Sequence, residues 1–383
     1  MTDDPPPNPG LLPSGVVDLL PSEAEAEAVA VGRLMKVFAS HGYERVKPPL
    51  VEFADGLLAG TGAAMAEQTF KLMDPDTHRT LGLRADMTPQ VARIASTRLA
   101  ARPRPLRLSY AGQCLRVRGT QVDPSRQVAQ AGIELIGPDS PAADAEMVLL
   151  AAEALTAVGV PRLSFDLTMP TLAPALLDDA GIAGPARASL VRALDRKDAA
   201  QVTRHGGRIA RLLTELLLAA GPVGSAMAVL EAAELGAGPA LLRDRLRETI
   251  EAIRVRAPDL RLTLDPVEFR GFRYHTGLCL DIFALGRAEE LGRGGRYISN
   301  EQEPATGLTL FPDAILRVCP PPKQRARAFL PWGSDPECAA RLRQDGFATV
   351  PALDGAAPPH AEAVRLNCTH ILRDGQPVAL QPE

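Results

Sequence analysis

The stretch from Leu106 to Gly137 constrains the fold of this chain more than any other. Apolar and polar residues alternate from Leu106 to Tyr110, which is typical of a half-buried β-strand. The Gly, Asp, Pro and Ser residues between Gly119 and Ser125 then predict a loop. A second strand is predicted to return over about Gln127–Ile136.

One face of this second strand carries Gln130, Gly132 and Glu134, where Val or Leu would be expected. A solvated sheet face is one interpretation. The floor of a binding pocket is the other, because Gly132 would let a ligand approach while Gln130 and Glu134 bind it. The residues by themselves leave both interpretations open.

The order strand, arginine-bearing loop, strand resembles motif 2 of the class II aminoacyl-tRNA synthetases, and residues 130–134 are similar to its histidyl-tRNA synthetase version. Residues 22–53 resemble motif 1, a helix and a proline-containing strand that build a dimer interface. Residues 83–90 resemble the segment that holds the amino acid's ammonium group, with Asp86 and Thr88 as acceptors. Capping of a helix that starts near Pro89 is the alternative role for both residues.

Two later segments are also similar to this family. Residues 267–283 resemble its histidyl-specific segment, in which Arg270 and Tyr274 match and His275 stands at the second tyrosine. The resemblance implies that Arg270 binds the substrate carboxylate or reacting centre, and that Tyr274 or His275 lies near the imidazole. A surface charge is the alternative for Arg270. Residues 292–297 resemble a glycine-rich loop of the family.

Three positions depart from the ATP-using members of the family. Arg116 stands at the motif 2 arginine, but Arg118 replaces the acidic residue expected two positions later. Ala314 replaces the motif 3 arginine, and Pro312 stands where a helix should start. Loss of one positioned arginine typically costs about 3–5 orders of magnitude in phosphoryl-transfer rate. These degenerate ATP-site positions imply a chain with no catalytic residues that does not form an adenylate.

The expected fold class is α+β: a class II synthetase-like antiparallel sheet flanked by helices, with a helical insertion and a small C-terminal α/β domain. The expected boundaries are a disordered tail at 1–10, the synthetase-like domain at 11–317 with its insertion at about 172–260, a linker at 318–324, and the C-terminal domain at 325–383. That last domain is shorter than the family's anticodon-binding domain and has no basic or aromatic-rich surface, so no tRNA partner is expected.

Composition narrows the remaining possibilities. The 383 residues carry a net charge of -4, without the basic excess typical of a nucleic-acid binder. Five cysteines form no CxxC pair, which argues against a zinc site or a disulfide framework and suits a reducing cytosol. Neither a signal peptide nor an unbroken apolar run long enough for a membrane span is evident. A cytoplasmic protein without a metal or other cofactor is expected.

A histidyl synthetase-like pocket, altered ATP motifs and a shortened C-terminal domain together resemble the regulatory subunits of ATP phosphoribosyltransferase. The resemblance implies a non-catalytic, self-dimerising subunit that joins a short-form ATP phosphoribosyltransferase catalytic subunit in a hetero-octamer. It would serve the first step of histidine biosynthesis and allow feedback regulation by L-histidine. The implied histidine ligands are Asp86, Thr88, Gln130, Glu134, Arg270, Tyr274 and His275. An active histidyl-tRNA synthetase and a stand-alone histidine-sensing module are the alternatives.

Overall fold

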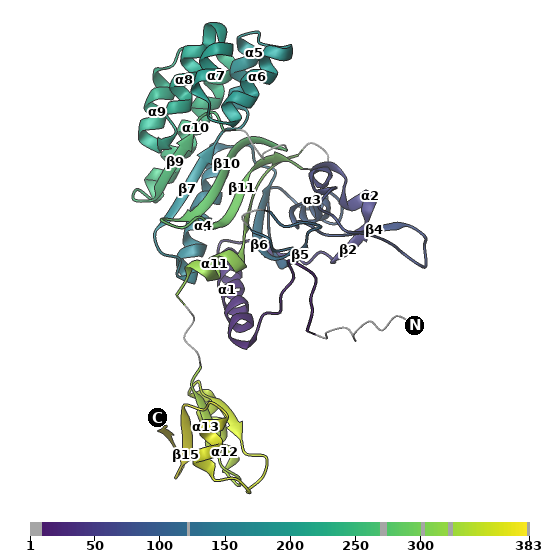
Figure 1. Ribbon diagram of the computed structural model, residues 1–383, viewed down its shortest axis with the longest axis vertical. Coiled ribbons are helices and arrows are strands. Elements are labelled where there is room, and N and C mark those ends of the chain that lie inside the picture. Colours follow the sequence, from purple (N-terminus) through teal and green to yellow (C-terminus); the bar gives the residue numbers. More distant parts are fainter. Residues whose placement is uncertain (1–9, 121–122, 269–273, 300–302, 321–324, 381–383) are drawn as a thin grey trace, which may run out of the picture. The chain divides into compact units, whose positions relative to one another are not determined.

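The computed structural model describes residues 10–120, 123–268, 274–299, 303–320 and 325–380. The predicted disordered tail therefore lies outside the described residues, apart from Gly10. The chain forms two compact units, Met1–Pro320 and Pro321–Glu383, and Figure 1 shows the elements of each.

A nine-stranded sheet forms the centre of the first unit. Its order is β1 (Glu44–Arg45), β5 (Leu106–Leu115), β6 (Gln127–Ile136), β12 (Pro304–Leu310), β11 (Glu290–Ile298), β10 (His275–Ala284), β7 (Leu163–Thr168), β9 (Arg261–Asp265) and β8 (Gly221–Pro222). The strands from β5 to β7 in this order all pair antiparallel, whereas β1 with β5 and β7 with β9 are parallel. The predicted fold class is confirmed.

Helices cover one face of this sheet. The helix α4 (Pro141–Val158) packs against α1 (Pro21–Ser40) and α10 (Ala237–Arg256), and their apolar residues form the main hydrophobic core with the strands. Local sequence sets the limits of α4: the Ser140 hydroxyl accepts a hydrogen bond from the Ala143 N–H, and Gly159 ends the helix at φ 102°. The other face is thereby left open for the site.

A smaller hydrophobic cluster lies beside α3 (Thr88–Ser96) and includes Met87, Val91, Tyr110 and Tyr297. Next to it, β2 (Val51–Phe53), β4 (Thr80–Leu83) and β3 (Lys71–Met73) form a separate three-stranded sheet. The proline-containing strand predicted within residues 22–53 is therefore two short strands, β1 and β2, which lie in different sheets on either side of Pro48-Pro49. Proline has no N–H for the ladder, and the chain leaves the large sheet at Pro48-Pro49 and enters the small one as β2.

Two further local expectations are corrected. Residues 292–297 are part of the strand β11 and not a glycine-rich loop, because added Cβ atoms at Gly292 and Gly294 would lie 2.6 and 2.3 Å from backbone oxygens of β12. Pro312 does not prevent a helix; it is the first residue of α11 (Pro312–Val318), where a missing N–H leaves no helical bond unmade.

Further helices follow β7 in the range predicted for the insertion, and Figure 1 shows them gathered beyond β9. They are α5 (Leu172–Asp179), α6 (Gly184–Asp195), α7 (Ala199–His205), the 3₁₀-helix η2 (Gly207–Ile209), α8 (Ala210–Leu218) and α9 (Val223–Ala232), before α10. Two short helices, α2 (Ala54–Leu57) and the 3₁₀-helix η1 (Gly60–Met65), lie between β2 and β3. Across the described ranges, no helix combines the length and apolarity needed to span a membrane.

The second unit is a small α/β structure whose four-stranded sheet has the order β14 (Ala348–Pro351), β13 (Arg327–Leu330), β15 (His370–Arg373) and β16 (Gln376–Ala379). Its helices are α12 (Pro336–Gln344) and α13 (Pro359–Arg365). The hairpin between β15 and β16 turns at Asp374 and Gly375, both with positive φ, as the Asp-Gly pair predicts.

Candidate functional site

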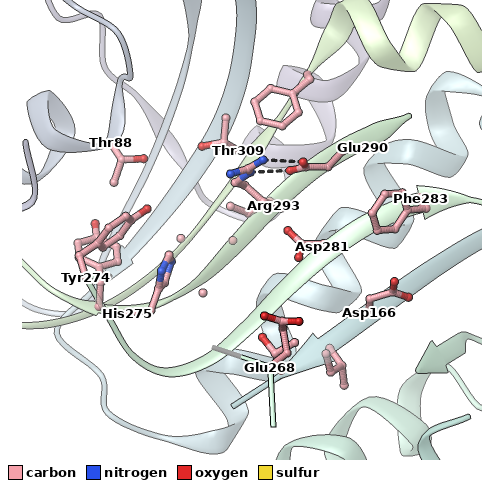
Figure 2. A pocket seen from close by; sticks show the side chains of 18 of the residues that line it. Thr88, Asp166, Glu268, Tyr274, His275, Asp281, Phe283, Glu290, Arg293 and Thr309 are labelled. Carbon is pink, nitrogen blue, oxygen red and sulfur yellow. Dashed lines mark hydrogen bonds and ion pairs between the residues drawn. The ribbon is translucent and has the colours of Figure 1, made fainter. Parts of the chain in front are cut away.

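A cavity of about 950 Å³ lies on the sheet face opposite α4. The strand β11 shows the two faces: Arg296 reaches Asp144 of α4, whereas its neighbours Gly295 and Tyr297 line the cavity. The pairing of β6, β12, β11, β10 and β7 aligns side chains in rows across this floor. One such row, from β12 to β7, runs Thr309, Arg293, Asp281, Asp166. Figure 2 shows all four side chains of this row in the cavity.

Glu134 lies fully buried at one end of the cavity. Its Oε1 accepts hydrogen bonds from the hydroxyls of Thr88 (2.9 Å) and Tyr110 (3.3 Å), and its Oε2 accepts one from Tyr297 (2.8 Å). Burial raises the pKa of Glu134 to about 8, although the hydroxyl donors oppose the rise. The three hydroxyl donors hold this carboxyl group in place. A bound ligand that carries a hydrogen-bond donor or a positive charge would favour its ionised form.

Asp86 lies beside this network and lines the same cavity. Its Oδ1 accepts from the Thr88 backbone N–H at 2.8 Å, but the N-cap of α3 is Met87 and no side chain caps this helix, so the capping interpretation is not confirmed for Asp86. Its Oδ2 accepts from the Gln130 amide at 3.0 Å, and Gln130 Oε1 accepts from the Met87 N–H at 3.0 Å. Gln130 is buried behind Asp86 and does not line the cavity, so the structure gives it a positioning role rather than a ligand contact.

Tyr274 and His275 form a wall at the same end of the cavity as Thr88, as Figure 2 shows. Their rings stack with centroids 4.1 Å apart, and Tyr274 meets Tyr297 edge-on at 6.1 Å. Burial lowers the pKa of His275 to about 4, and Arg293 adds to the decrease, so the imidazole is neutral. Arg270, the predicted partner of a carboxylate, lies outside the described residues.

Arg116 and Arg118, the two positions predicted for motif 2, line the cavity, and the Arg116 Nε donates to the Ala85 carbonyl at 3.5 Å. Ala314 does not reach it. That residue is 4% exposed and packs in the main hydrophobic core, so it contributes no charge to the cavity.

Carboxylates outnumber cations among the described residues that line the cavity. The carboxylates are Asp86, Glu134, Asp166, Asp265, Glu268, Asp281 and Glu290, and the cations are Arg116, Arg118, Lys197 and Arg293. Lys197 already pairs with Asp265 (2.6 Å), and Arg293 already pairs with Glu290 (2.5 Å). Such a lining favours ligands with cationic or N–H groups over a triphosphate. Within the described ranges, no group of three or more potential ligand side chains is placed to hold a metal ion.

Several lining residues were not predicted from the sequence, namely Tyr297, Asp166, Asp281, Glu290 and Arg293. A signal existed for two of them. Asp166 and Asp281 alternate with apolar residues in segments that predict strands, which places carboxylates on the face that those apolar residues avoid.

Residues 15–315 match the family model described as histidyl-tRNA synthetase. The ATP phosphoribosyltransferase regulatory subunit of Paramagnetospirillum magneticum is 53% identical over 365 residues, covering 95% of this chain and 96% of the relative. The subunit of the same name from Gluconobacter oxydans is 51% identical over 370 residues, covering 96% and 97%. The chain belongs to the family of ATP phosphoribosyltransferase regulatory subunits. This confirms the family that the motifs indicate.

Solved structures agree on the fold of this family. The ATP phosphoribosyltransferase regulatory subunit/histidyl-tRNA synthetase of Bacillus halodurans superposes with a TM-score of 0.82 at 23% identity, covering 96% of this chain and 98% of that one. The histidyl-tRNA synthetase of Nostoc sp. PCC 7120 gives a TM-score of 0.77 at 19% identity, covering 94% and 90%. ATP phosphoribosyltransferase regulatory subunits of this kind therefore share the synthetase architecture, and membership in the family indicates that the chain is not itself catalytic.

Proposed function

We propose that this chain binds L-histidine and communicates its concentration to an ATP phosphoribosyltransferase catalytic subunit, as the feedback-sensing part of the first step of histidine biosynthesis. Membership in the regulatory-subunit family implies the catalytic partner. The observation that carries the sensing role is the buried carboxyl group of Glu134, held by three hydroxyls beside Asp86 and the Tyr274–His275 wall.

The chemistry of histidine matches this end of the cavity. Its ammonium group has three donors, and Asp86 and Thr88 offer acceptors two residues apart, just before and at the start of α3. Its imidazole can donate a ring N–H to Glu134, with His275 or Tyr274 on the other side. Gln130 acts indirectly, by fixing the Asp86 carboxylate. Arg270 is the expected partner of the histidine carboxylate, since its guanidinium can form a bidentate pair.

Adenylation is not part of the proposed function. Class II chemistry needs positioned cations at both ends of the triphosphate. The motif 3 position carries Ala314 inside the hydrophobic core, and two of the four described cations of the cavity are engaged by carboxylates. Wild-type protein is expected to show no histidine-dependent exchange of labelled pyrophosphate into ATP. Exchange at synthetase-like rates would overturn this part of the proposal.

The proposed assembly is a self-dimer that joins the short-form catalytic subunit, in a hetero-octamer, without bound tRNA. The motif 1-like unit supports the dimer. Ahead of α1, Val17, Leu19 and Leu20 expose apolar side chains that a partner surface would cover. Sedimentation of the isolated chain tests the dimer, and co-purification with the catalytic subunit tests the larger assembly.

Calorimetric titration with L-histidine tests the sensing role. Glu134→Ala and Asp86→Ala should each weaken binding at least tenfold, because each leaves a donor of the ligand without its acceptor. Asp259→Ala, at an exposed carboxylate ahead of β9, is the control and should bind like wild type. In the complex, both cavity variants should blunt inhibition by histidine and leave activation of the catalytic subunit intact. Absence of histidine binding by wild type would refute the sensing role.

A further inference from the structure

Two carboxylates lie directly opposite each other at the end of the cavity formed by β7 and β10. Asp281 of β10 pairs in register with Asp166 of β7, and both line the cavity. Residues in register on neighbouring strands have Cβ atoms about 5 Å apart, and like charges placed there destabilise a sheet. Figure 2 shows both side chains on the cavity side, with Glu268 nearby.

The described cations of this region are paired with other carboxylates, although Arg293 lies in register with Asp281 and its charge partly offsets the raised pKa of that group. Lys197 binds Asp265 at 2.6 Å and Glu268 at 3.2 Å, and Arg293 is held by both oxygens of Glu290. Neither forms an ion pair with Asp166 or Asp281 within the described part of the chain.

The two carboxylates also differ in their own hydrogen bonding. Asp166 accepts one hydrogen bond, from the Thr263 hydroxyl at 2.5 Å. Burial raises the pKa of Asp281 to about 7, Glu290 adds to the rise and Arg293 opposes it. Asp281 is therefore a carboxyl group that a cation would readily ionise.

A second observation points to a ligand at the same place. Thr168 lies two residues after Asp166 on the same face of β7 and also lines the cavity. Its side chain is only 5% exposed, and its hydroxyl has no hydrogen-bond partner among the described residues. A buried hydroxyl without a partner costs free energy, which a ligand that donates a hydrogen bond would recover.

The cavity is large enough for a second ligand group in addition to histidine. The Glu134 end contains the acceptors proposed for histidine, whereas Asp166, Thr168 and Asp281 come from β7 and β10, on the far side of β11 and β12 from β6. The backbone at Gly294, Gly295 and Gly307 lines the space between the two ends without side chains.

We propose that Asp166, Asp281 and Thr168 form an anionic subsite that binds the ammonium or guanidinium head of an organic cation. Two carboxylates and a hydroxyl supply acceptors for the several N–H donors of such a head, and ionised partners make these hydrogen bonds strong. This subsite does not depend on histidine binding at Glu134, so either proposal can fail alone.

The test is calorimetric titration of the full chain, without histidine, with agmatine and with n-butylamine. n-Butanol has the same carbon chain as n-butylamine with an uncharged head, and it should not bind. Asp281→Asn should weaken binding of both amines at least tenfold while leaving histidine binding unchanged. Asp259→Asn makes the same chemical change at an exposed position outside the cavity and should bind like wild type. Thr168→Val, which keeps the side-chain shape, should weaken binding severalfold and provides a second variant if Asp281→Asn does not fold.

Each other outcome has a defined meaning. If neither amine binds wild type at millimolar concentration, the two carboxyl groups share a proton instead, and the proposal is overturned. It is also overturned if Asp281→Asn binds like wild type, or if Mg²⁺ alone binds and displaces the amines. Repeating the titration on the complex with the catalytic subunit identifies the source of the cation. Retained binding indicates a free amine, and lost binding indicates a Lys or Arg side chain of the assembly.

Discussion

The side chain of Glu134 occupies the space that a side chain at Gly307 would need. The two residues lie opposite each other on β6 and β12, and a Cβ atom at Gly307 would lie 1.9 Å from Glu134 Oε2. The glycine therefore determines where the buried carboxyl group can lie, and with it the hydrogen bond from Tyr297.

Gly307→Ala should displace Glu134 and weaken histidine binding at least tenfold, because the methyl group and the carboxyl group cannot share this space. Calorimetry with L-histidine measures the change. Gly224→Ala is the matched control: an added Cβ in α9 meets nothing within 4 Å, and alanine is the better helix former. That variant should bind histidine normally and be slightly more stable. Equal affinities for both variants would contradict the role given to Gly307.

Glu134→Gln should change how stability depends on pH. The pKa of Glu134 is raised to about 8 in the folded protein, from an ordinary value of 4.5. Between these values the folded state binds more protons than the unfolded state, so this group lowers the free energy of unfolding as the pH rises. The slope is at most about 1.4 kcal/mol per pH unit. The glutamine variant lacks this loss, so its stability relative to wild type should increase across the window and become constant above about pH 8.

Urea denaturation at several pH values between the two pKa values measures this difference. Glu248→Gln makes the same substitution at an exposed position of α10 and should give a curve parallel to that of wild type. A parallel curve for Glu134→Gln as well would show that the buried carboxyl group is ionised in the folded protein.

Gln130→Met tests the positioning role of this amide. The substitution keeps the side-chain length but removes the bond to Asp86 and leaves the Met87 N–H without its acceptor, at a cost of about 1–3 kcal/mol in stability. Histidine affinity should fall as well, although Gln130 does not line the cavity. Gln113→Met is the control, since the Gln113 amide binds Glu27 outside the cavity. Gln113→Met should leave histidine affinity unchanged. If Gln130 has only a structural role, Gln130→Met should leave histidine affinity unchanged as well.

Arg296→Met should be strongly destabilising. Arg296 is 3% exposed and binds the buried Asp144 through its Nε and Nη2 atoms at 2.9 and 2.8 Å. Breaking a buried pair typically costs about 3–5 kcal/mol, and the upper part of this range is not expected here because Arg245 still lies 3.4 Å from Asp144. Thermal and urea unfolding measure this cost. Arg365→Ala breaks an exposed pair with Glu362 and should have no measurable effect, and similar losses in both variants would contradict the importance of burial.

The sequence was most informative where chemistry depends on local spacing. Asp86 and Thr88 are two residues apart, and Gln130 and Glu134 share one strand face, so motif resemblance could predict these residues together. The carboxylate pair Asp166–Asp281 could not be predicted in this way. More than a hundred residues separate its members, and only the antiparallel register of β7 and β10 places them opposite each other.

Glycine and proline misled the local predictions for a physical reason. Both residues usually mark loops, yet Gly292 and Gly294 allow close approach of backbone within β11, and Pro312 starts a helix. Whether such a residue lies in a loop, a strand or a helix depends on tertiary packing. The residues next to it in the sequence do not show how closely other parts of the chain approach it.

Arg84 joins the small three-stranded sheet to β5 of the large sheet. Its Nε donates to the Gln113 carbonyl of β5 at 2.8 Å, its Nη1 donates to the Pro48 carbonyl at 3.0 Å, and its own N–H donates to the Leu50 carbonyl at 3.1 Å. Asp86 follows only two residues later. The carboxylate proposed to bind histidine therefore lies on the same short segment that Arg84 fastens to the crossing between the two sheets.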